Sequence, residues 1–218
     1  MLENNIVVLD LETAKSADDC LHCMNPVGDH STHKYTKIGW DNKVALGLSI
    51  GCFYDYRDQR VHWFDTPTLE ETVREFVETQ PLLVSYNGIS FDFALMNALL
   101  LQRADDMRDE NISGCTDERP GSALARTQSD SLALVTLCDA FTTLCATSYD
   151  ILAEIWKANP ARKFESGLNS LDVVSQANGC GAKLGHGAQA PKDWRGGHYA
   201  KVLNYCSQDA YLTKSLFE

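Results

Sequence analysis

Two acidic side chains interrupt an apolar run near the start of the chain, and acids in such a place could do chemistry. Residues 6–13 read IVVLDLET, with Asp10 and Glu12 among aliphatic neighbours typical of a buried strand. Side chains two positions apart on a strand point to the same face, so both carboxylates would lie side by side at the strand's end. Because unpaired buried charge is costly, we expect a positive charge to meet them there.

Two further acids stand where they could join this pair. Asp92, in YNGISFDF, comes just inside an expected helix after a buried strand, which directs it toward the sheet edge where ligands gather. Asp209 follows Tyr205 by four residues in YCSQD, so both share one helical face. Four converging carboxylates repel one another unless cations intervene, and hard oxygen ligands suit magnesium or manganese. Two such ions about 4 Å apart are the usual arrangement for cleaving a phosphodiester bond.

The elements that must position these acids form an α/β pattern. The expected strands cover 6–13, 44–55, 60–65 and 81–87, and residues 131–138 form a further strand or the start of a helix. The expected helices begin at a capping box of Thr68 and Glu71 and then cover 91–102, 147–158, 168–178 and 198–218. Three strands before the first helix argue against a Rossmann-type alternation and for a mixed sheet with an antiparallel half.

The remaining segments are polar or rich in glycine. We expect a loop insertion at about 14–43 and a surface loop at about 104–125, and the Gly-rich stretch 179–197 breaks the helical pattern. His186 and His198 would be loop residues able to touch a substrate. At 218 residues the chain is long enough for one hydrophobic core, so we expect a single domain over 1–218.

Charge and composition restrict the partners. The chain carries 19 basic residues against 30 acidic ones, a net charge of −11, which argues against broad adhesion to nucleic acid or to an anionic membrane. Acids that converge on metal cations invert the local field, so nucleic acid can still bind at such a site. The N-terminus lacks the pattern of a signal peptide, no stretch reaches the roughly 18 apolar residues that span a bilayer, and the eight cysteines are scattered as reduced thiols would be. We therefore expect an intracellular, cytoplasmic protein without a membrane partner.

Three motifs follow one another in the order of a known superfamily. They are Asp10-Leu-Glu12, then Asn87-x-x-x-Phe91-Asp92, then Tyr205-x-x-x-Asp209. In this order they resemble the DEDD superfamily of 3′-to-5′ exonucleases on the ribonuclease H-like fold. The third motif is typical of the tyrosine branch, because the histidine branch would have His where this chain has Asn204. Segments 170–185 and 205–213 also resemble exonuclease domains related to family B DNA polymerases, so the similarity covers most of the chain, although no polymerase domain is present.

The resemblance implies a role for each matching residue. The metal ligands would be the four acids, Asp10, Glu12, Asp92 and Asp209. Tyr205 would orient the attacking water. The residues expected to hold the second motif and the 3′ end of the substrate are Asn87 and Phe91, together with Leu11 and Thr13 beside the first two acids.

The implied fold is a ribonuclease H-like sheet of five strands, with strands 1–3 antiparallel, the others parallel, and helices on its flanks. The implied activity is removal of nucleotides from the 3′ end of single-stranded DNA or RNA with two Mg²⁺ or Mn²⁺ ions. The resemblance also suggests a replication or repair protein as a partner. Two alternatives stay open. One is a nucleic-acid-binding module that has kept the fold and lost catalysis, and the other is an endonuclease or resolvase, which the Tyr205 motif disfavours.

A second group of metal-ligand residue types lies in the early insertion. Cys20 and Cys23 are followed by His30 and His33, which are zinc-ligating types at short spacing. The spacing fits no common zinc finger. The sequence therefore favours an ordinary polar insertion over a structural Zn²⁺ site.

Overall fold

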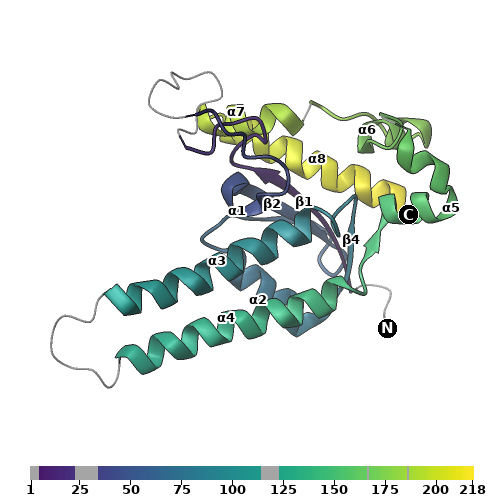
Figure 1. Cartoon of the computed structure of the whole chain (residues 1–218). Coiled ribbons are helices and arrows are strands. Elements are labelled where there is room, and N and C mark those ends of the chain that lie inside the picture. The colour runs from purple at the N-terminus through teal and green to yellow at the C-terminus, as the bar shows by residue number, and fades with distance from the viewer. Residues whose placement is uncertain (1–4, 23–33, 114–122, 166, 186) are drawn as a thin grey trace.

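A five-stranded mixed sheet forms the centre of the computed structural model, which describes residues 5–22, 34–113, 123–165, 167–185 and 187–218 (Figure 1). The strands are β1 (Ile6–Thr13), β2 (Leu48–Asp55), β3 (Arg60–Phe64), β4 (Leu82–Ser85) and β5 (Tyr149–Asp150), in the spatial order β3-β2-β1-β4-β5. Strands β1 to β3 pair antiparallel, whereas β4 and β5 run parallel to β1. The mixed sheet predicted from the three opening strands is therefore confirmed.

Helices cover both faces of this sheet. One face carries α2 (Leu69–Thr79), α3 (Asp92–Ser113) and α4 (Ala123–Cys145), and α3 and α4 run side by side away from the sheet (Figure 1). The other face carries the long C-terminal helix α8 with shorter helices near it (Figure 1). These elements are α5 (Ile151–Ala158), α6 (Leu171–Ala177), α7 (Ala190–Arg195) and α8 (Tyr199–Phe217), with 3-10 turns at η1 (Pro160–Phe164) and η2 (Gly187–Gln189).

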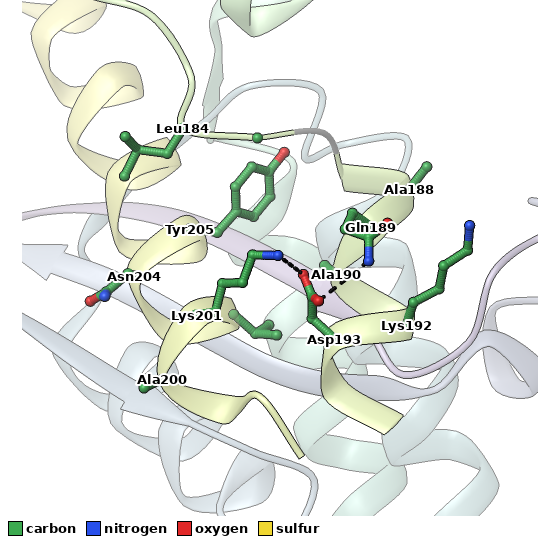
Figure 2. A pocket seen from close by; sticks show the side chains of 12 residues that line it. Leu184, Ala188, Gln189, Ala190, Lys192, Asp193, Ala200, Lys201, Asn204 and Tyr205 are labelled. Carbon is green, nitrogen blue, oxygen red and sulfur yellow. Dashed lines mark hydrogen bonds and ion pairs between the residues drawn. The ribbon is translucent and has the colours of Figure 1, made fainter. Parts of the chain in front are cut away.

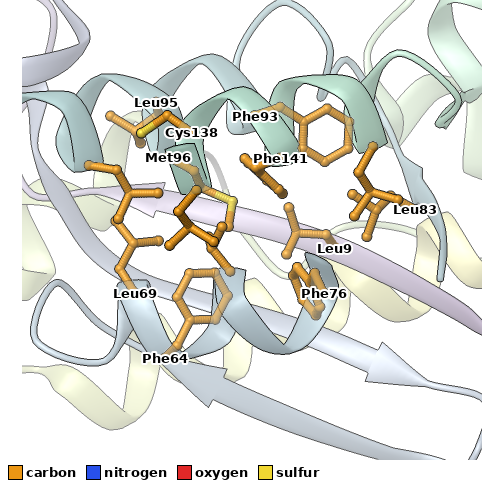
Figure 3. Packing of buried hydrophobic residues seen from close by; sticks show 14 of the residues in the cluster. Leu9, Phe64, Leu69, Phe76, Leu83, Phe93, Leu95, Met96, Cys138 and Phe141 are labelled. Carbon is orange, nitrogen blue, oxygen red and sulfur yellow. The ribbon is translucent and has the colours of Figure 1, made fainter. Parts of the chain in front are cut away.

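The main hydrophobic core lies between the sheet and α2, α3 and α4. Figure 3 shows Leu9 of β1 and Leu83 of β4 meeting Phe76 of α2 and Phe141 of α4. Val7, Leu9 and Leu11, the odd-numbered residues of β1, all belong to this cluster. Because side chains alternate along a strand, the even-numbered residues of β1 must face the other layer.

The second face of β1 is covered by α8. Cys52 and Ile50 are the cross-strand partners of Asp10 and Glu12, and both pack with α8 residues such as Val202. Directly opposite residues in an antiparallel pair share a face. Asp10 and Glu12 therefore share the face under α8, which confirms the sequence prediction for this pair.

The loop expected at 104–125 is wrong over its first part, because α3 continues to Ser113 and α4 already begins at Ala123. Residues 114–122 lie outside the described ranges. Ala104 is fully buried in the core, and Ser131 of α4 donates its hydroxyl to the Ala104 carbonyl at 2.9 Å. The polar composition of this stretch is that of an exposed helix face, which the sequence pattern could not separate from a loop.

Several boundaries also differ from expectation. The second strand begins at Leu48 rather than at 44, because the preceding residues form the short helix α1 (Lys43–Leu46), whose first turn Asn42 caps through its side chain. Residues 131–138 belong to α4, and the fifth strand is the two-residue β5. Thr68 is the N-cap of α2 without a side-chain capping bond, because its hydroxyl oxygen accepts the backbone N–H of Asp65 instead. Within the described residues, no helix combines the length and apolar character needed to cross a membrane.

The described parts of the early insertion, 14–22 and 34–42, are irregular, apart from a bridge between Cys20 and Lys37. Three members of the suggested zinc set, Cys23, His30 and His33, lie outside the described residues. The Gly-rich stretch, in contrast, contains α7, which its composition had hidden. The predicted helices over 168–178 and 198–218 are present as α6 and α8.

Candidate active site

Three carboxylates meet between β1 and α8. Asp10 and Glu12 come from the second half of β1, and Asp209 comes from the buried side of α8. One ligand atom from each lies within 4.8 Å of the others, a spacing at which the three could hold a metal ion. Glu12 is 7% exposed and Asp209 is 2% exposed. The structure thus brings together three of the four acids that the sequence singled out.

Two oxygen atoms of this cluster have no partner among the described residues. Asp10 Oδ2 and Asp209 Oδ1 are buried, and neither accepts a hydrogen bond. Buried polar atoms are normally satisfied, so such orphans mark a place where another group belongs. An all-carboxylate donor set suits a hard divalent cation such as Mg²⁺ or Mn²⁺. The residues present therefore fit a metal ion.

The electrostatics of the cluster agree with this geometry. Burial, followed by the charge of Asp209 and then that of Glu12, raises the pKa of Asp10 well above its usual range. Burial and Asp209 raise the pKa of Glu12 in the same way, although the nearby Lys183 opposes the shift. Without a cation these acids hold their protons more tightly than free carboxyl groups do. A divalent cation would reverse that preference.

Asp92 lies close to the three-carboxylate cluster without belonging to it. It is the first residue of α3 and is 5% exposed. Burial, and then the charge of Asp150, raise the pKa of Asp92 to about 7, and Asp209 adds a smaller contribution in the same direction. Asp92 also contributes to raising the pKa values of Asp10 and Glu12. Asp92 therefore interacts electrostatically with the three carboxylates.

Asp150 shapes the loop that carries Asp92, and the sequence had not indicated it. Its Oδ1 accepts the backbone N–H of Asn87 at 3.0 Å, and its Oδ2 accepts that of Ile89 at 3.1 Å. The same carboxylate caps α5 through the N–H groups of Leu152 and Ala153. Asp150 therefore fixes the start of α3 from the neighbouring strand, a non-local contact that no local motif marks.

Two residues of this loop need their particular types. Asn87 has a φ of 70°, a left-handed conformation that Asn tolerates better than most residues. A Cβ atom on Gly88 would lie 2.3 Å from Ser85 Oγ, so only glycine allows the loop to turn back onto β4. These constraints explain the Asn-Gly pair at the start of the second motif.

Tyr205 lies one helical turn before Asp209, as the motif predicted. Its side chain is buried, and its hydroxyl has no hydrogen-bond partner among the described residues. Two glycines lie close to this side chain. A Cβ on Gly185 would lie 3.6 Å from the Tyr205 ring, and a Cβ on Gly187 would lie 3.5 Å from its hydroxyl. Burial and then the charge of Asp209 raise the pKa of Tyr205, so its hydroxyl stays protonated.

No family model matches the sequence, and comparison with curated proteins and with solved structures finds no significant match. The functional interpretation therefore depends on the site's own residues. The sequence did not indicate Lys183 as a site residue, because Lys183 stands in the Gly-rich stretch, which has neither a helical nor a strand period.

Lys183 brings a positive charge to the acids. Its ammonium group forms an ion pair with Asp209 Oδ2 and lies 4.9 Å from the centre of the Tyr205 ring. Burial alone would lower the pKa of Lys183, but the charges of Asp209 and Asp10 outweigh it and raise that pKa. Gln208 holds the segment in register, since it accepts the N–H of Leu184 at 2.6 Å and donates to the Ala182 carbonyl at 2.8 Å.

The other residues expected at the site take different positions. Leu11 is buried in the core on the opposite face of β1, so it is not beside the acids as the resemblance implied. Thr13 is buried after an irregularity in the β1–β2 register. Phe91 is half-buried directly before Asp92. His198 caps the start of α8, and His186 lies outside the described residues.

A cavity of about 830 Å³ adjoins Tyr205 between α7, α8 and residues 184, 185, 188 and 189 (Figure 2). Much of its lining is apolar, including Leu184, Ala190 and Val202. At its rim Lys201 Nζ lies 2.7 Å from Asp193 Oδ2, as Figure 2 shows. Cavities of this volume and character are typical of small-molecule sites. Tyr205 lines the cavity, whereas Asp10, Glu12 and Asp209 are not among its described lining residues.

Proposed function

We propose that the protein is a metal-dependent 3′-to-5′ exonuclease of the tyrosine type. The observation that carries this proposal is the cluster of Asp10, Glu12 and Asp209 with buried, unpartnered oxygens, one helical turn from the equally unpartnered hydroxyl of Tyr205. Carboxylates that bind divalent cations are common in the active sites of enzymes that hydrolyse phosphodiester bonds. Among the described residues the Tyr205 hydroxyl has no hydrogen-bond partner, so it is available to bind a water molecule.

The architecture supports the same proposal. The order β3-β2-β1-β4-β5, with β1 to β3 antiparallel and β4 and β5 parallel to β1, is the layout expected of a ribonuclease H-like fold. In such a sheet the central strand carries the first acids and the last helix crosses above it. Asp10 and Glu12 on β1 and Asp209 on α8 agree with that arrangement.

Each residue would have a distinct task. Asp10, Glu12 and Asp209 would hold the ions, and Asp92 would complete the ligand set once the substrate is bound. Bound Mg²⁺ or Mn²⁺ would supply Lewis-acid activation of the phosphodiester and of water. The Tyr205 hydroxyl, kept protonated by burial, can orient a water molecule toward the phosphorus. The cavity beside Tyr205 gives room for a nucleotide of the strand being cut.

The test is digestion of 5′-labelled single-stranded DNA and RNA with Mg²⁺, with Mn²⁺ and with EDTA. We expect a descending ladder of products that depends on the metal, and its intensity on the two substrates identifies the preferred nucleic acid. Asp209→Asn should abolish the ladder, whereas Asp139→Asn, which changes an exposed acid of α4, serves as the matched control. Internal cuts without a ladder would identify an endonuclease instead.

One observation favours a second candidate, a binding module without catalysis. The Lys183 ammonium group already neutralises Asp209 and could take the place of a cation. Lys183→Met distinguishes the two, because removal of this internal cation should increase metal affinity. If wild-type protein binds single strands and never cleaves them with any metal, while Lys183→Met gains metal binding, the protein is a binding module without catalysis.

A further inference from the structure

An exposed tryptophan in the early insertion, a segment that no motif explains, contacts the residue that precedes Asp92. Trp40, in the early insertion, meets Phe91 edge to face with ring centres 5.7 Å apart. Lys43 lies over the Phe91 ring with its ammonium nitrogen 4.2 Å from the ring centre. The next residue after Phe91 is Asp92, and the charge of Lys43 partly opposes the rise in the Asp92 pKa that burial and Asp150 cause. The three side chains therefore form a surface at the edge of the candidate active site.

Within this surface, Phe91 has little ring area left for a ligand. It is half-buried and packs on the small cluster of Ala17, Ile38 and Leu46. Lys43 covers it further. Trp40 is 59% exposed, so its indole offers the open aromatic face. Phe91 acts as a support for Trp40 rather than as the contact surface itself.

The position of Trp40 is built into the fold. The N–H of Ile38 donates to the Asp19 carbonyl at 3.0 Å, and that of Gly39 donates to the Ala17 carbonyl at 2.9 Å. Lys43 Nζ donates to the Trp40 carbonyl at 2.7 Å. These bonds anchor both sides of Trp40 while its ring stays exposed. The backbone of Trp40 is therefore fixed in place, and the exposed indole is presented next to Phe91.

We propose that Trp40 is the stacking surface for a base of the single-stranded substrate, with Phe91 as its support and Lys43 as the cation for an adjacent phosphate. This inference rests on the proposed nuclease function and adds its substrate contact. Bases of any sequence stack on exposed aromatic rings, and a nearby cation attracts the strand's backbone. In a chain with a net charge of −11, such a local cation matters for holding a polyanion.

Trp40→Ala tests the proposal in steady-state digestion of a single-stranded oligonucleotide. We expect KM to rise about 5- to 150-fold, the equivalent of the 1–3 kcal/mol that one stacked base contributes, while kcat changes little. Trp40→Phe should recover part of the loss. Trp63→Ala is the matched control, because Trp63 is 55% exposed on β3 and donates its indole N–H to Ser207. A melting curve of each variant shows that the fold is kept.

Abasic substrates identify the base that is stacked. A single abasic residue is placed in turn at each of the last few positions of the strand. At one position the missing base should weaken binding to wild type and add nothing to the defect of Trp40→Ala. Phe91→Leu, which keeps the supporting volume, should raise KM less than Trp40→Ala does.

The outcomes separate the two proposals. If wild type degrades no strand with either metal, the nuclease function fails and the stacking role fails with it. If wild type makes a ladder while Trp40→Ala behaves like Trp63→Ala, only the stacking role is wrong. A larger KM effect for Phe91→Leu than for Trp40→Ala, or additive abasic effects at every position, would also overturn the role of Trp40.

Discussion

On one face of β1, Leu9 packs among the apolar side chains of α2, α3 and α4, whereas on the other face its neighbour Asp10 keeps a buried oxygen without a hydrogen bond. The two side chains are adjacent in sequence and both lie under helices. Burial of the Leu9 side chain stabilises the folded state. Burial of a charged Asp10 carboxylate destabilises it, because desolvation and the nearby acids oppose the charge.

The contrast shows how the two layers divide their tasks. The layer of α2 to α4 stabilises the fold, and its stability allows the layer under α8 to keep three mutually repelling carboxylates in place. A substitution on the first face should therefore weaken the fold, whereas a neutralising one on the second face should strengthen the metal-free fold and remove activity.

The largest effect is expected from Asp10→Ala or Asp92→Ala on cleavage. Each removes a group from the electrostatic stabilisation of the transition state, so the rate should fall on the order of 10³-fold or more. Initial rates on labelled single-stranded DNA measure the loss, and melting in EDTA should be no lower than for wild type. A near-native rate in either variant, with contaminating nuclease excluded, would refute the site.

Leu9→Ala should have the opposite profile. Leu9 is fully buried in the core, so its truncation leaves a cavity and costs about 2–5 kcal/mol of unfolding free energy. Urea denaturation measures this loss, which should be the same with and without metal. A loss below about 1 kcal/mol would mean that the two faces of β1 are energetically alike, contrary to the comparison.

Tyr205→Phe should be milder than loss of an acid. The hydroxyl can orient a water molecule without holding metal, so we expect a rate lower by on the order of 10²-fold and an unchanged rise of the melting temperature with metal. Titration of Mg²⁺ or Mn²⁺ against melting temperature, with Asp209→Ala in parallel, checks both points. Equal loss of metal affinity in the two variants would give Tyr205 another role.

The smallest effect concerns the metal-free fold and pH. Burial and then Asp150 raise the folded-state pKa of Asp92 to about 7, above the value of about 4 in an unfolded chain. Such a group binds its proton more tightly when folded, so its stabilising contribution is complete below about pH 4 and is lost as the pH rises through about 7. In EDTA the melting temperature should fall over this range, and Asp92→Asn should flatten the fall.

Metal should reverse the order of the variants. At pH 7 in EDTA, the unfolding free energy of Asp10→Asn should exceed that of wild type by on the order of 1 kcal/mol. For a domain of this size, its melting temperature should then be about 2–4 °C higher. A ligand that binds only the folded state adds about 2.7 kcal/mol at a hundredfold excess over Kd, and Asp10→Asn should gain far less of it. If the variant gains as much as wild type from up to roughly 10 mM Mg²⁺ or Mn²⁺, the acids do not form a metal site.

The sequence predicted the local part of this site and missed the non-local part. The two-residue period of β1 was sufficient to put Asp10 and Glu12 on one face, and the four-residue spacing in α8 put Tyr205 beside Asp209. Lys183 escaped because its place depends on Gln208 of another element and not on any local repeat. Asp150 escaped for the same reason, since its partners lie more than sixty residues earlier.

For the fold as well, local sequence patterns predicted some elements, whereas others depend on contacts between distant segments. Apolar runs located β1 and β4, and the helical spacing of the buried residues located α8. The outer half of α3 could not be found this way, because few of its side chains described up to residue 109 are buried and α3 packs along α4. The two-residue strand β5 is too short to have a period of its own.

That short strand has a consequence for solubility. β5 forms one edge of the sheet and pairs with β4 at only two positions, after which Asp150 turns its carboxylate to α5 and to the loop of Asn87. An edge this short presents few free backbone groups to a second molecule, which protects against edge-to-edge aggregation. Lengthening β5 would require Asp150 to leave its partners. The residue that orders the second motif therefore also ends the edge strand β5 after two residues.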